Sequence, residues 1–361
     1  MGSNFKNVEK IRKQILRRDT VLYVDKDSMV SFRGGDIIYS RCGETLSFRL
    51  PISSYQRLLI HFRIIERLLR LTPRCAEKIG DGIFLISFRG KVYKLDAINH
   101  RFVVEHEYRS EMNNPLAFTR VKDVKGFDDG VLYGEYFMNP DKAPVHVWHR
   151  DEAGEWSRVY TFDGNITHIH NIIPDPRHQC MYILTGDESC ESAIWKASDN
   201  FKYVEPLVIG SQQNRSCVAF VEDDGIIYAT DTPLDNNAIY YVSEGNVKKV
   251  YDMPGPCIYG TSKNGKMYFA TSVEPDSTLP AWRYFMTYKL GKGVKNRFVH
   301  IVAGNVSDGF YEIVKFKKDL WPMTLFQFGN VQFPYDERLD EICMTATSVR
   351  KYDGKSILMK I

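Results

Sequence analysis

One pattern repeats along most of this chain at intervals of 40 to 49 residues. Each unit has a turn, a short apolar run, a small or acidic break, and a second run rich in aromatic residues. The aromatic residues that mark the first run of five units are Phe84, Tyr133, Tyr182, Tyr228 and Tyr268. A sixth copy closes the chain at 341–361, and a more divergent copy occupies 21–50. A period of this size is typical of repeat architectures built from one supersecondary unit.

Each unit is predicted to fold as a β-sheet. Each contains about four short apolar runs separated by Gly, Asp, Asn and Pro, which is the pattern of antiparallel strands joined by turns. Four-stranded units repeated radially form a β-propeller. The sequence therefore predicts an all-β fold with a single propeller over 21–361 and seven blades. Six blades is the alternative, if the first and last units share one blade, and a two-sheet sandwich is less favoured because it uses fewer strands.

Three stretches depart from this pattern. Residues 1–20 form a basic segment outside the predicted propeller, and they could fold as a short amphipathic helix. The stretch 60–71 is a second candidate helix, and 290–330 is too long for one connection.

Composition excludes several classes of function. The chain has 48 basic and 45 acidic residues, so a broad nucleic-acid-binding surface is not expected. No stretch approaches the roughly 20 apolar residues of a membrane span, and the N-terminus lacks the apolar region of a secretory signal. Seven cysteines without a C-x-x-C pair fit reduced thiols. We therefore expect a cytoplasmic protein without a membrane span.

Two hairpins resemble the Asp-box of the sialidase-like (BNR-repeat) propellers, a Ser-x-Asp-x-Gly-x-Thr-Trp turn. In IIYSRCGETLSF, Cys42 replaces the aspartate and Leu46 the tryptophan. The matching residues there are Ser40, Gly43 and Thr45. A shortened second copy, IWKASDNFKYVEP, contains Ser198 and Asp199. The resemblance implies the fold and not a chemistry, because an Asp-box is a folding element at the turn between outer strands.

Polar residues stand where the apolar runs of the central units stop. In a propeller blade the first strand is innermost and the second runs antiparallel beside it, so the start of one and the end of the other share one mouth of the channel. The residues at the starts of first strands are Asn114, Thr167, His168 and Arg215. The residues at the ends of second strands are Glu135, Asp187, Asp231 and Glu274. The sequence thus predicts that four blades each bring a carboxylate to one mouth.

His168 and His170 are spaced two apart in a predicted strand. Such side chains share one face, and the rise of a strand separates them by about 7 Å. With Asp187 or Glu135 as a third ligand they could hold a divalent metal. The interpretation that we favour from sequence is a hydrogen-bonded pair in a polar channel, with His168 as general acid or base and no cofactor.

These residues favour a carbohydrate-linked propeller that acts on an acidic oligosaccharide or polysaccharide, as a hydrolase or a lyase. The candidate catalytic residues are His168, Glu135, Asp187 and Asp231. The candidate substrate-binding residues are Arg215, which suits a uronate carboxylate, and Tyr133, His170, Glu274, Asn114 and Trp282. Tyr136 is a further candidate platform for a sugar ring. A non-catalytic propeller that binds a protein or sugar partner is the alternative.

Sialidase activity is not expected. Sialidases clamp a carboxylate with three arginines and use a Tyr–Glu pair as nucleophile. Here Arg215 is the only arginine well placed at the predicted mouth, although Arg74 and Arg120 lie near other inner strands. Tyr133 and Glu135 lie on one strand and are not brought together from separate blades.

Overall fold

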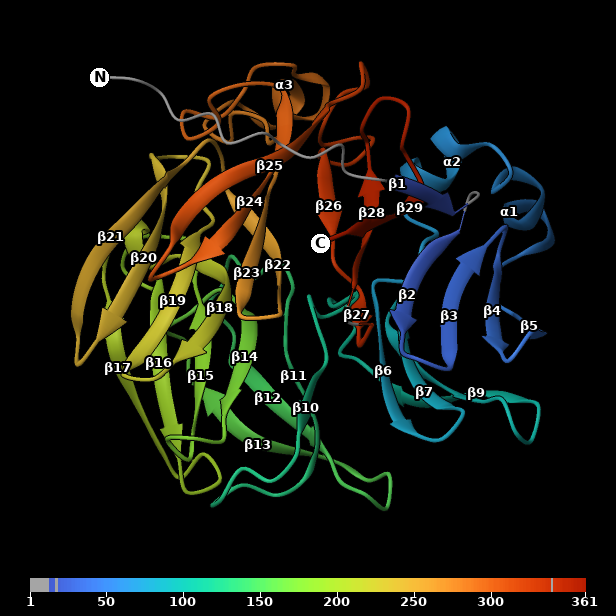
Figure 1. The fold of residues 1–361 in the computed structure, drawn as a ribbon, viewed down its shortest axis with the longest axis horizontal. Helices are drawn as coiled ribbons and strands as arrows, with labels where there is room; N and C mark the ends of the chain where they lie inside the picture. Colours follow the sequence, from blue (N-terminus) through green and yellow to red (C-terminus); the bar gives the residue numbers. More distant parts are fainter. Residues whose placement is uncertain (1–12, 17–18, 339) are drawn as a thin grey trace.

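A computed structural model describes residues 13–16, 19–338 and 340–361 of this chain. Within these residues seven sheets are arranged in a ring, so the predicted seven-bladed β-propeller is confirmed (Figure 1). The chain passes around the ring once, from the blue first blade to the red last one, and the first strand of each blade lies toward the centre. Neighbouring strands within a blade are antiparallel.

The first four blades follow one another in chain order. The first contains β2 (Thr20–Val24), β3 (Ser28–Arg33), β4 (Asp36–Arg41) and β5 (Glu44–Arg49). The second contains β6 (Cys75–Gly80), β7 (Ile83–Phe88), β8 (Lys91–Asp96) and β9 (Arg101–Glu107). The third contains β10 (Thr119–Val121), β11 (Gly130–Gly134), β12 (Val145–Arg150) and β13 (Trp156–Phe162). The fourth contains β14 (Ile169–Asp175), β15 (Cys180–Thr185), β16 (Ala193–Ser198) and β17 (Tyr203–Ile209).

The last three blades complete the ring. A short 3₁₀ turn, η1 (Gln212–Asn214), leads into the fifth, which contains β18 (Ser216–Glu222), β19 (Gly225–Thr230), β20 (Asn237–Ser243) and β21 (Asn246–Met253). The sixth contains β22 (Cys257–Lys263), β23 (Lys266–Thr271), β24 (Phe298–Asn305) and β25 (Gly309–Lys317). The seventh contains β26 (Asn330–Gln332), β28 (Glu341–Thr347), β29 (Lys355–Lys360) and β1 (Lys13–Leu16).

The two ends of the chain close the ring together. β1 pairs antiparallel with β29, so residues near the N-terminus supply the outer strand of the last blade. β27 (Tyr335–Asp336) pairs in parallel with β2 and ties the last blade to the first. Residues 13–16 belong to the basic segment that we expected outside the propeller, with a short helix as one option, and they form a strand within it. The physical reason is the unpaired edge of β29, whose backbone groups need partners. Residues 1–12 of that segment lie outside the described residues.

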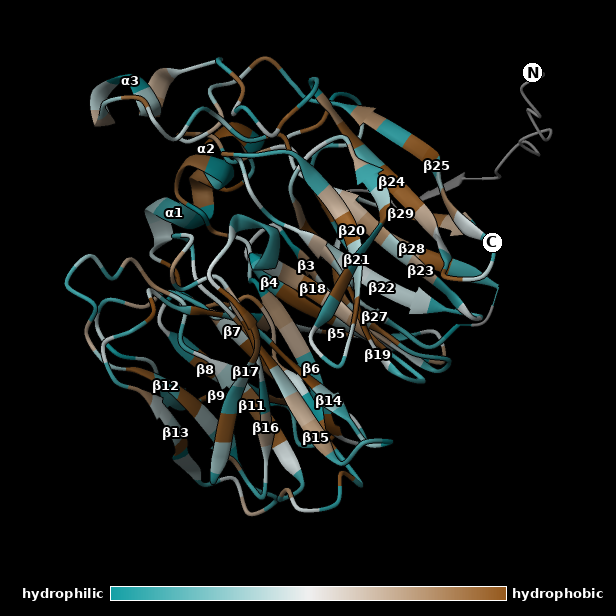
Figure 2. Cartoon of the chain, turned by 90° about the vertical axis from the view of Figure 1, so that its left-hand side faces the viewer, coloured by the Kyte–Doolittle hydropathy of each residue, from teal (hydrophilic) through white to brown (hydrophobic). Residues whose placement is uncertain are grey.

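Three short α-helices in the described part of the chain lie on one side of the ring (Figure 2). They are α1 (Ser54–Leu59), α2 (Arg63–Leu68) and α3 (Ala281–Met286). α2 lies within the stretch 60–71 that was expected to be helical, and α3 lies between β23 and β24. The long stretch 290–330 contains β24 and β25. Across the described ranges, no helix has the length and apolar character needed to cross a bilayer.

The repeat in the sequence corresponds to the packing between blades. All five marker aromatics lie in second strands, β7, β11, β15, β19 and β23, and all are buried. Both faces of these strands are covered by neighbouring blades, so every residue of β15 is buried. Tyr133 is one of the markers and is only 1% exposed, so almost none of its side chain is available to a ligand in this structure, and its role in binding substrate stays a prediction.

Both Asp-box-like segments lie at the turn between the third and fourth strands of a blade. Ser40 and Thr45 face each other across the β4–β5 turn, with their hydroxyl oxygens 3.3 Å apart. Asp199 follows Ser198 in the β16–β17 turn. The position is the one expected for an Asp-box, and membership of the sialidase-like family stays a prediction.

Candidate functional site at the channel mouth

Arg215 joins carboxylates from separate blades at one mouth of the channel. It lies directly before β18, and its Nη2 is 2.9 Å from Asp187 Oδ1 and 3.8 Å from Asp231 Oδ2. Asp187 follows β15 and Asp231 follows β19. Burial would lower the pKa of Arg215, but the charges of Asp187, Asp231 and Glu274 raise it above its usual value. The structure therefore brings together three of the four predicted carboxylates with Arg215.

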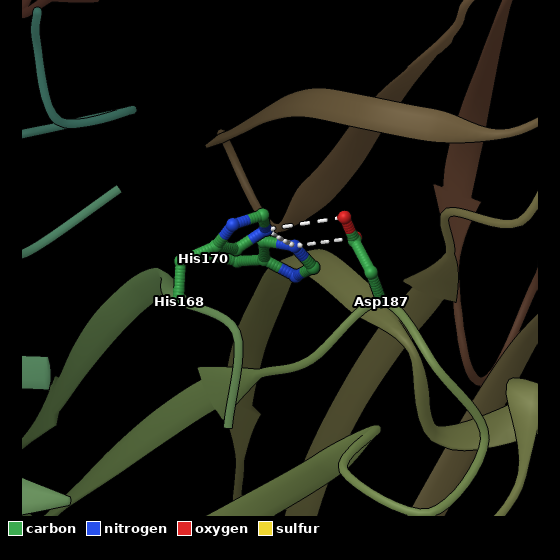
Figure 3. A group of neighbouring side chains, drawn as sticks. All are labelled: His168, His170 and Asp187. Carbon is green, nitrogen blue, oxygen red and sulfur yellow. Dashed lines mark hydrogen bonds and ion pairs between the residues drawn. The ribbon is translucent and has the colours of Figure 1, made fainter. Parts of the chain in front are cut away.

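The two histidines converge at the start of β14. A β-bulge between Ile169 and Asn171 interrupts the pairing of β14 with β15, and such a bulge re-aims side chains. The Nε2 atoms of His168 and His170 are 3.0 Å apart, and both side chains are buried. The carboxylate of Asp187 lies opposite, 3.5 Å from His168 Nε2 and 3.4 Å from His170 Nε2 (Figure 3).

Backbone carbonyls orient both imidazole rings. His168 Nδ1 is 3.1 Å from the carbonyl oxygen of Phe137, and His170 Nδ1 is 2.9 Å from that of Ser216. A carbonyl oxygen only accepts hydrogen bonds, so each Nδ1 carries a proton and donates it. Phe137 lies between β11 and β12, and Ser216 begins β18, so three blades meet at this pair of histidines.

A tight turn holds Asp187 in place. Gly186 has φ of +90°, and a Cβ there would lie 2.3 Å from the carbonyl oxygen of Glu191. The buried carboxylate of Glu191 accepts hydrogen bonds from the backbone N–H of Asp187 (2.9 Å) and from the hydroxyl of Thr167 (2.6 Å). Burial raises the pKa of Glu191, but the hydrogen bonds from Lys142 and Thr167 dominate and lower it to about 2. Glu191 therefore positions Asp187. The feature of the sequence that could have indicated a role for Glu191 is the turn formed by Gly186 and Asp187.

The carboxylates at the mouth differ in their affinity for a proton. Burial would raise the pKa of Asp187, but its close contacts with His168 and His170 and the charge of Arg215 hold it well below its usual range. Glu274 is different: burial and then the charge of Asp231 raise its pKa to about 8. The mouth therefore contains one ionised carboxylate and one that keeps its proton at neutral pH.

Several buried polar atoms beside the histidines lack a partner among the described residues. They are Arg215 Nε, Ser216 Oγ and Asp231 Oδ1. The second oxygen of Asp231 accepts a hydrogen bond from the thiol of Cys217 at 3.2 Å. Buried polar atoms almost always have a partner, so unsatisfied atoms at one place indicate bound water or ligand there.

Arg74 is a further cation in this region. Its guanidinium lies over the ring of Tyr259, 5.5 Å from the centroid, and Tyr136 and Cys217 lie close enough to affect its pKa. Within the part of the chain that the structure describes, its side chain makes no hydrogen bond or ion pair. The ring of Tyr136 packs on that of His168, with centroids 4.2 Å apart. Tyrosine rings and an unpaired guanidinium thus line the mouth beside the histidines.

Two residues predicted for the site have other partners. The buried carboxylate of Glu135 accepts hydrogen bonds from Trp148 Nε1 (3.1 Å) and Arg109 Nη1 (3.2 Å). Among the described residues, no hydrogen bond or ion pair joins this carboxylate to either of the two histidines. Asn114 accepts a hydrogen bond from the hydroxyl of Ser87 at 2.9 Å.

Two aromatic residues of the prediction also lie apart from the histidines. Tyr133 packs in the core, where its hydroxyl is 2.9 Å from His106 Nε2. Trp282 is 72% exposed on α3, and the guanidinium of the neighbouring Arg283 lies over its ring, 5.0 Å from the centroid. A role for Trp282 as a sugar platform stays a prediction.

The comparisons with known proteins support the fold. No protein family and no curated protein matches the sequence. Among solved structures, a chain of the mitotic checkpoint complex is similar with a TM-score of 0.56 and 7% identity, covering 100% of this chain and 97% of that one. The AfRom2 CNH domain has a TM-score of 0.52 and 8% identity, covering 97% and 99%. The tricorn protease has a TM-score of 0.50 and 9% identity, covering 99% of this chain and 36% of that one. Identity this low shows a shared fold alone.

Proposed function

We propose that this protein binds an acidic oligosaccharide or polysaccharide at the mouth of its central channel and acts on it by acid–base chemistry. The observation that carries the proposal is the guanidinium of Arg74. A cation in a partly enclosed channel is costly unless an anion accompanies it, and Arg74 has no such partner among the described residues. A uronate carboxylate would supply one, because it matches the forked geometry of a guanidinium.

This assignment differs from the expectation that Arg215 binds the substrate carboxylate. Arg215 is already paired with Asp187 and contacts Asp231. Its charge is therefore used within the protein, whereas that of Arg74 is available to a ligand. The rings of Tyr136 and Tyr259 beside Arg74 offer apolar faces against which a sugar ring can pack.

The two kinds of carboxylate at the mouth support acid–base chemistry. Hydrolases and lyases both need one group that donates a proton and one that accepts a proton. Glu274, whose pKa is raised by burial to about 8, is the candidate donor. Asp187 with its two histidines is the candidate acceptor. Environments that push two pKa values apart in this way are typical of catalytic pairs.

Calorimetric titration of uronate oligosaccharides and of their carboxyl-reduced counterparts tests the proposal. We expect the wild-type protein to prefer the acidic sugar by at least about 10-fold, and Arg74→Gln to lose that preference. Arg120→Gln is the matched control, because Arg120 is exposed and donates only to the carbonyl of Lys78. Equal binding of both sugars, or an unchanged preference in Arg74→Gln, would refute the proposal. Mass spectrometry of products distinguishes a lyase, whose product lacks the added water, from a hydrolase.

A protein-binding propeller remains the second candidate, and exposed apolar side chains on the same side favour it. The largest are Trp282, Phe285 and Met286 on α3, and Tyr55 and Leu58 on α1. Exposed large apolar side chains are common at protein interfaces. Loss of a partner on Trp282→Ala, with no binding of any sugar, would support this second candidate. A cytoplasmic location stays a prediction under both.

A further inference from the structure

The ring nitrogens of His168 and His170 face each other in an arrangement that is unfavourable for two neutral imidazoles. Each Nδ1 donates its proton to a backbone carbonyl. In a neutral imidazole the other nitrogen, Nε2, is then an acceptor with a lone pair. Two lone pairs therefore point toward each other across 3.0 Å, and the carboxylate of Asp187 adds a third electron-rich group. Either a proton on one Nε2 or a metal ion between the three groups relieves this arrangement, and the distances distinguish the second case.

The distances fit a metal ion. Imidazole nitrogen and carboxylate oxygen bind a divalent transition metal at about 2.0–2.2 Å. Two ligand atoms at that distance, separated by an angle between octahedral and tetrahedral, lie about 2.9–3.5 Å from each other. The separations here are 3.0 Å between the two Nε2 atoms, 3.5 Å from His168 Nε2 to Asp187 Oδ2, and 3.4 Å from His170 Nε2 to Asp187 Oδ1, so each carboxylate oxygen faces one histidine. One Nε2 from each histidine and one oxygen of Asp187 all lie within 4.8 Å of one another.

The surroundings of the three groups are those of a metal site. Histidines that bind metals almost always donate the other ring N–H to a carbonyl or carboxylate, which orients the lone pair. Phe137 and Ser216 accept those hydrogen bonds here. Glu191 fixes the backbone of Asp187. These contacts orient the donor atoms before any ion is bound.

We propose that His168, His170 and Asp187 bind one divalent first-row transition-metal ion at the mouth of the channel. Two imidazoles and one carboxylate suit Zn²⁺, Fe²⁺ or Mn²⁺, and Zn²⁺ is the tightest of these three for such ligands. Three protein ligands leave coordination positions open for water or for an oxygen of a ligand. The unpartnered Oδ1 of Asp231, which lies in the same cluster, is available to accept a hydrogen bond from such a water.

The metal site stands on its own geometry and not on the proposed substrate. With a metal bound, the two histidines and Asp187 would be ligands and could not also accept a proton. A water bound to the metal would then be the proton acceptor. Arg215 opposes the binding of a second cation, but the charges of Asp187 and Asp231 offset it. A carboxylate-bearing sugar could then bind to the metal and to Arg74 together.

Metal titration of the full-length protein, freed of any affinity tag and stripped with a chelator, tests the proposal. We expect one Zn²⁺ per chain by calorimetry and elemental analysis. Co²⁺ should bind at the same stoichiometry and give visible absorption bands of an imidazole–carboxylate site. His170→Gln and Asp187→Asn should each weaken Zn²⁺ binding by at least about 100-fold. Circular dichroism of the metal-free variants checks that they remain folded.

His178→Gln is the matched control. His178 also pairs with a carboxylate, with its Nδ1 2.7 Å from Asp175 Oδ2, but it lies in the turn between β14 and β15, at the other end of β14 from His168 and His170. We expect this variant to bind Zn²⁺ as the wild type does. Absence of stoichiometric metal, or equal binding by His170→Gln and His178→Gln, would overturn the proposal. This experiment measures metal content and not sugar binding. A failure to bind acidic sugars would therefore refute the proposed function but not the metal site, and absence of metal would refute the metal site but not sugar binding.

Discussion

The Nε2 atoms of His168 and His170 lie 3.0 Å apart, although one residue separates them at the start of β14. A regular strand would hold such side chains about 7 Å apart. The β-bulge beside Ile169 and the carbonyl acceptors from two other segments bring the rings together. Segments of three blades therefore shape the pair, and its geometry depends on how these three blades pack together.

Glu274 is expected to make stability depend on pH. Burial raises its pKa from 4.5 to about 8, so the folded protein holds this proton more tightly than the unfolded chain. The stability that it contributes is complete below about 4.5 and is lost as the pH rises through about 8. Glu274→Gln keeps the neutral form at every pH. The free energy of unfolding of this variant relative to wild type should therefore rise across that window, by a few kcal/mol at most.

Denaturant unfolding at a series of pH values measures this difference. Glu44→Gln is the control, because Glu44 is exposed on β5. The control should follow the wild type throughout. A difference between Glu274→Gln and wild type that does not change with pH would show that Glu274 does not hold its proton in the folded protein.

Glu191 is expected to control the metal site through the backbone of Asp187. Glu191→Gln removes the charge that pairs with Lys142 and weakens the hydrogen bonds that order the turn. We predict that its affinity for Zn²⁺ falls roughly 10–100-fold, as for other groups that orient metal ligands. Calorimetry well below the unfolding temperature measures this. Glu188→Gln, in the same turn but exposed to solvent, should bind as the wild type does; a fall of the same size in both variants would contradict a specific role for Glu191.

Arg67 is expected to anchor α2 to the last blade. Its side chain is 2% exposed, pairs with Asp319 and Asp353, and donates to the carbonyl of Phe326. Arg67→Met removes charged hydrogen bonds from Asp319, which keeps Lys318, and from Asp353, which keeps Arg63, so we predict a loss of about 1.5–3 kcal/mol in the free energy of unfolding.

Urea denaturation of the two neighbouring arginine variants measures this effect. Arg70→Met should change stability by less than about 1 kcal/mol, because Arg70 is exposed and makes only one hydrogen bond, to Thr324. Equal losses for both variants would mean that the buried ion pairs of Arg67 do not hold the helix.

Much of the fold could be predicted because the repeat is a packing signal. The same position in each second strand must be apolar and large where two blades meet, and Phe84 and Tyr228 are examples. The repeat does not predict that β1 completes the last blade. KQIL is four residues long with polar neighbours, and its pairing with β29 depends on the unpaired edge of a blade formed more than 300 residues later.

The candidate site could be predicted only as far as backbone positions determine it. Asp187, Asp231 and Glu274 lie at one mouth because second strands end there. Glu135 occupies the equivalent position, but Trp148 and Arg109 take its carboxylate. The order of apolar and polar residues along a strand does not reveal such competition between side chains.

The short distance between the two histidine rings also could not be predicted from the sequence. A bulge at Ile169 changes the direction of His170, and the spacing of two residues cannot reveal it. The unpaired state of Arg74 was equally hidden, since it depends on which residues are absent around its side chain in space.

An anomalous-difference map from a crystal grown with Zn²⁺, recorded at the zinc absorption edge, tests the central claim most directly. We predict one strong peak about 2.0–2.2 Å from His168 Nε2, His170 Nε2 and a carboxylate oxygen of Asp187. A map with no peak among these three side chains, or with zinc bound only at other residues, would contradict the account of the channel mouth as a metal-binding site.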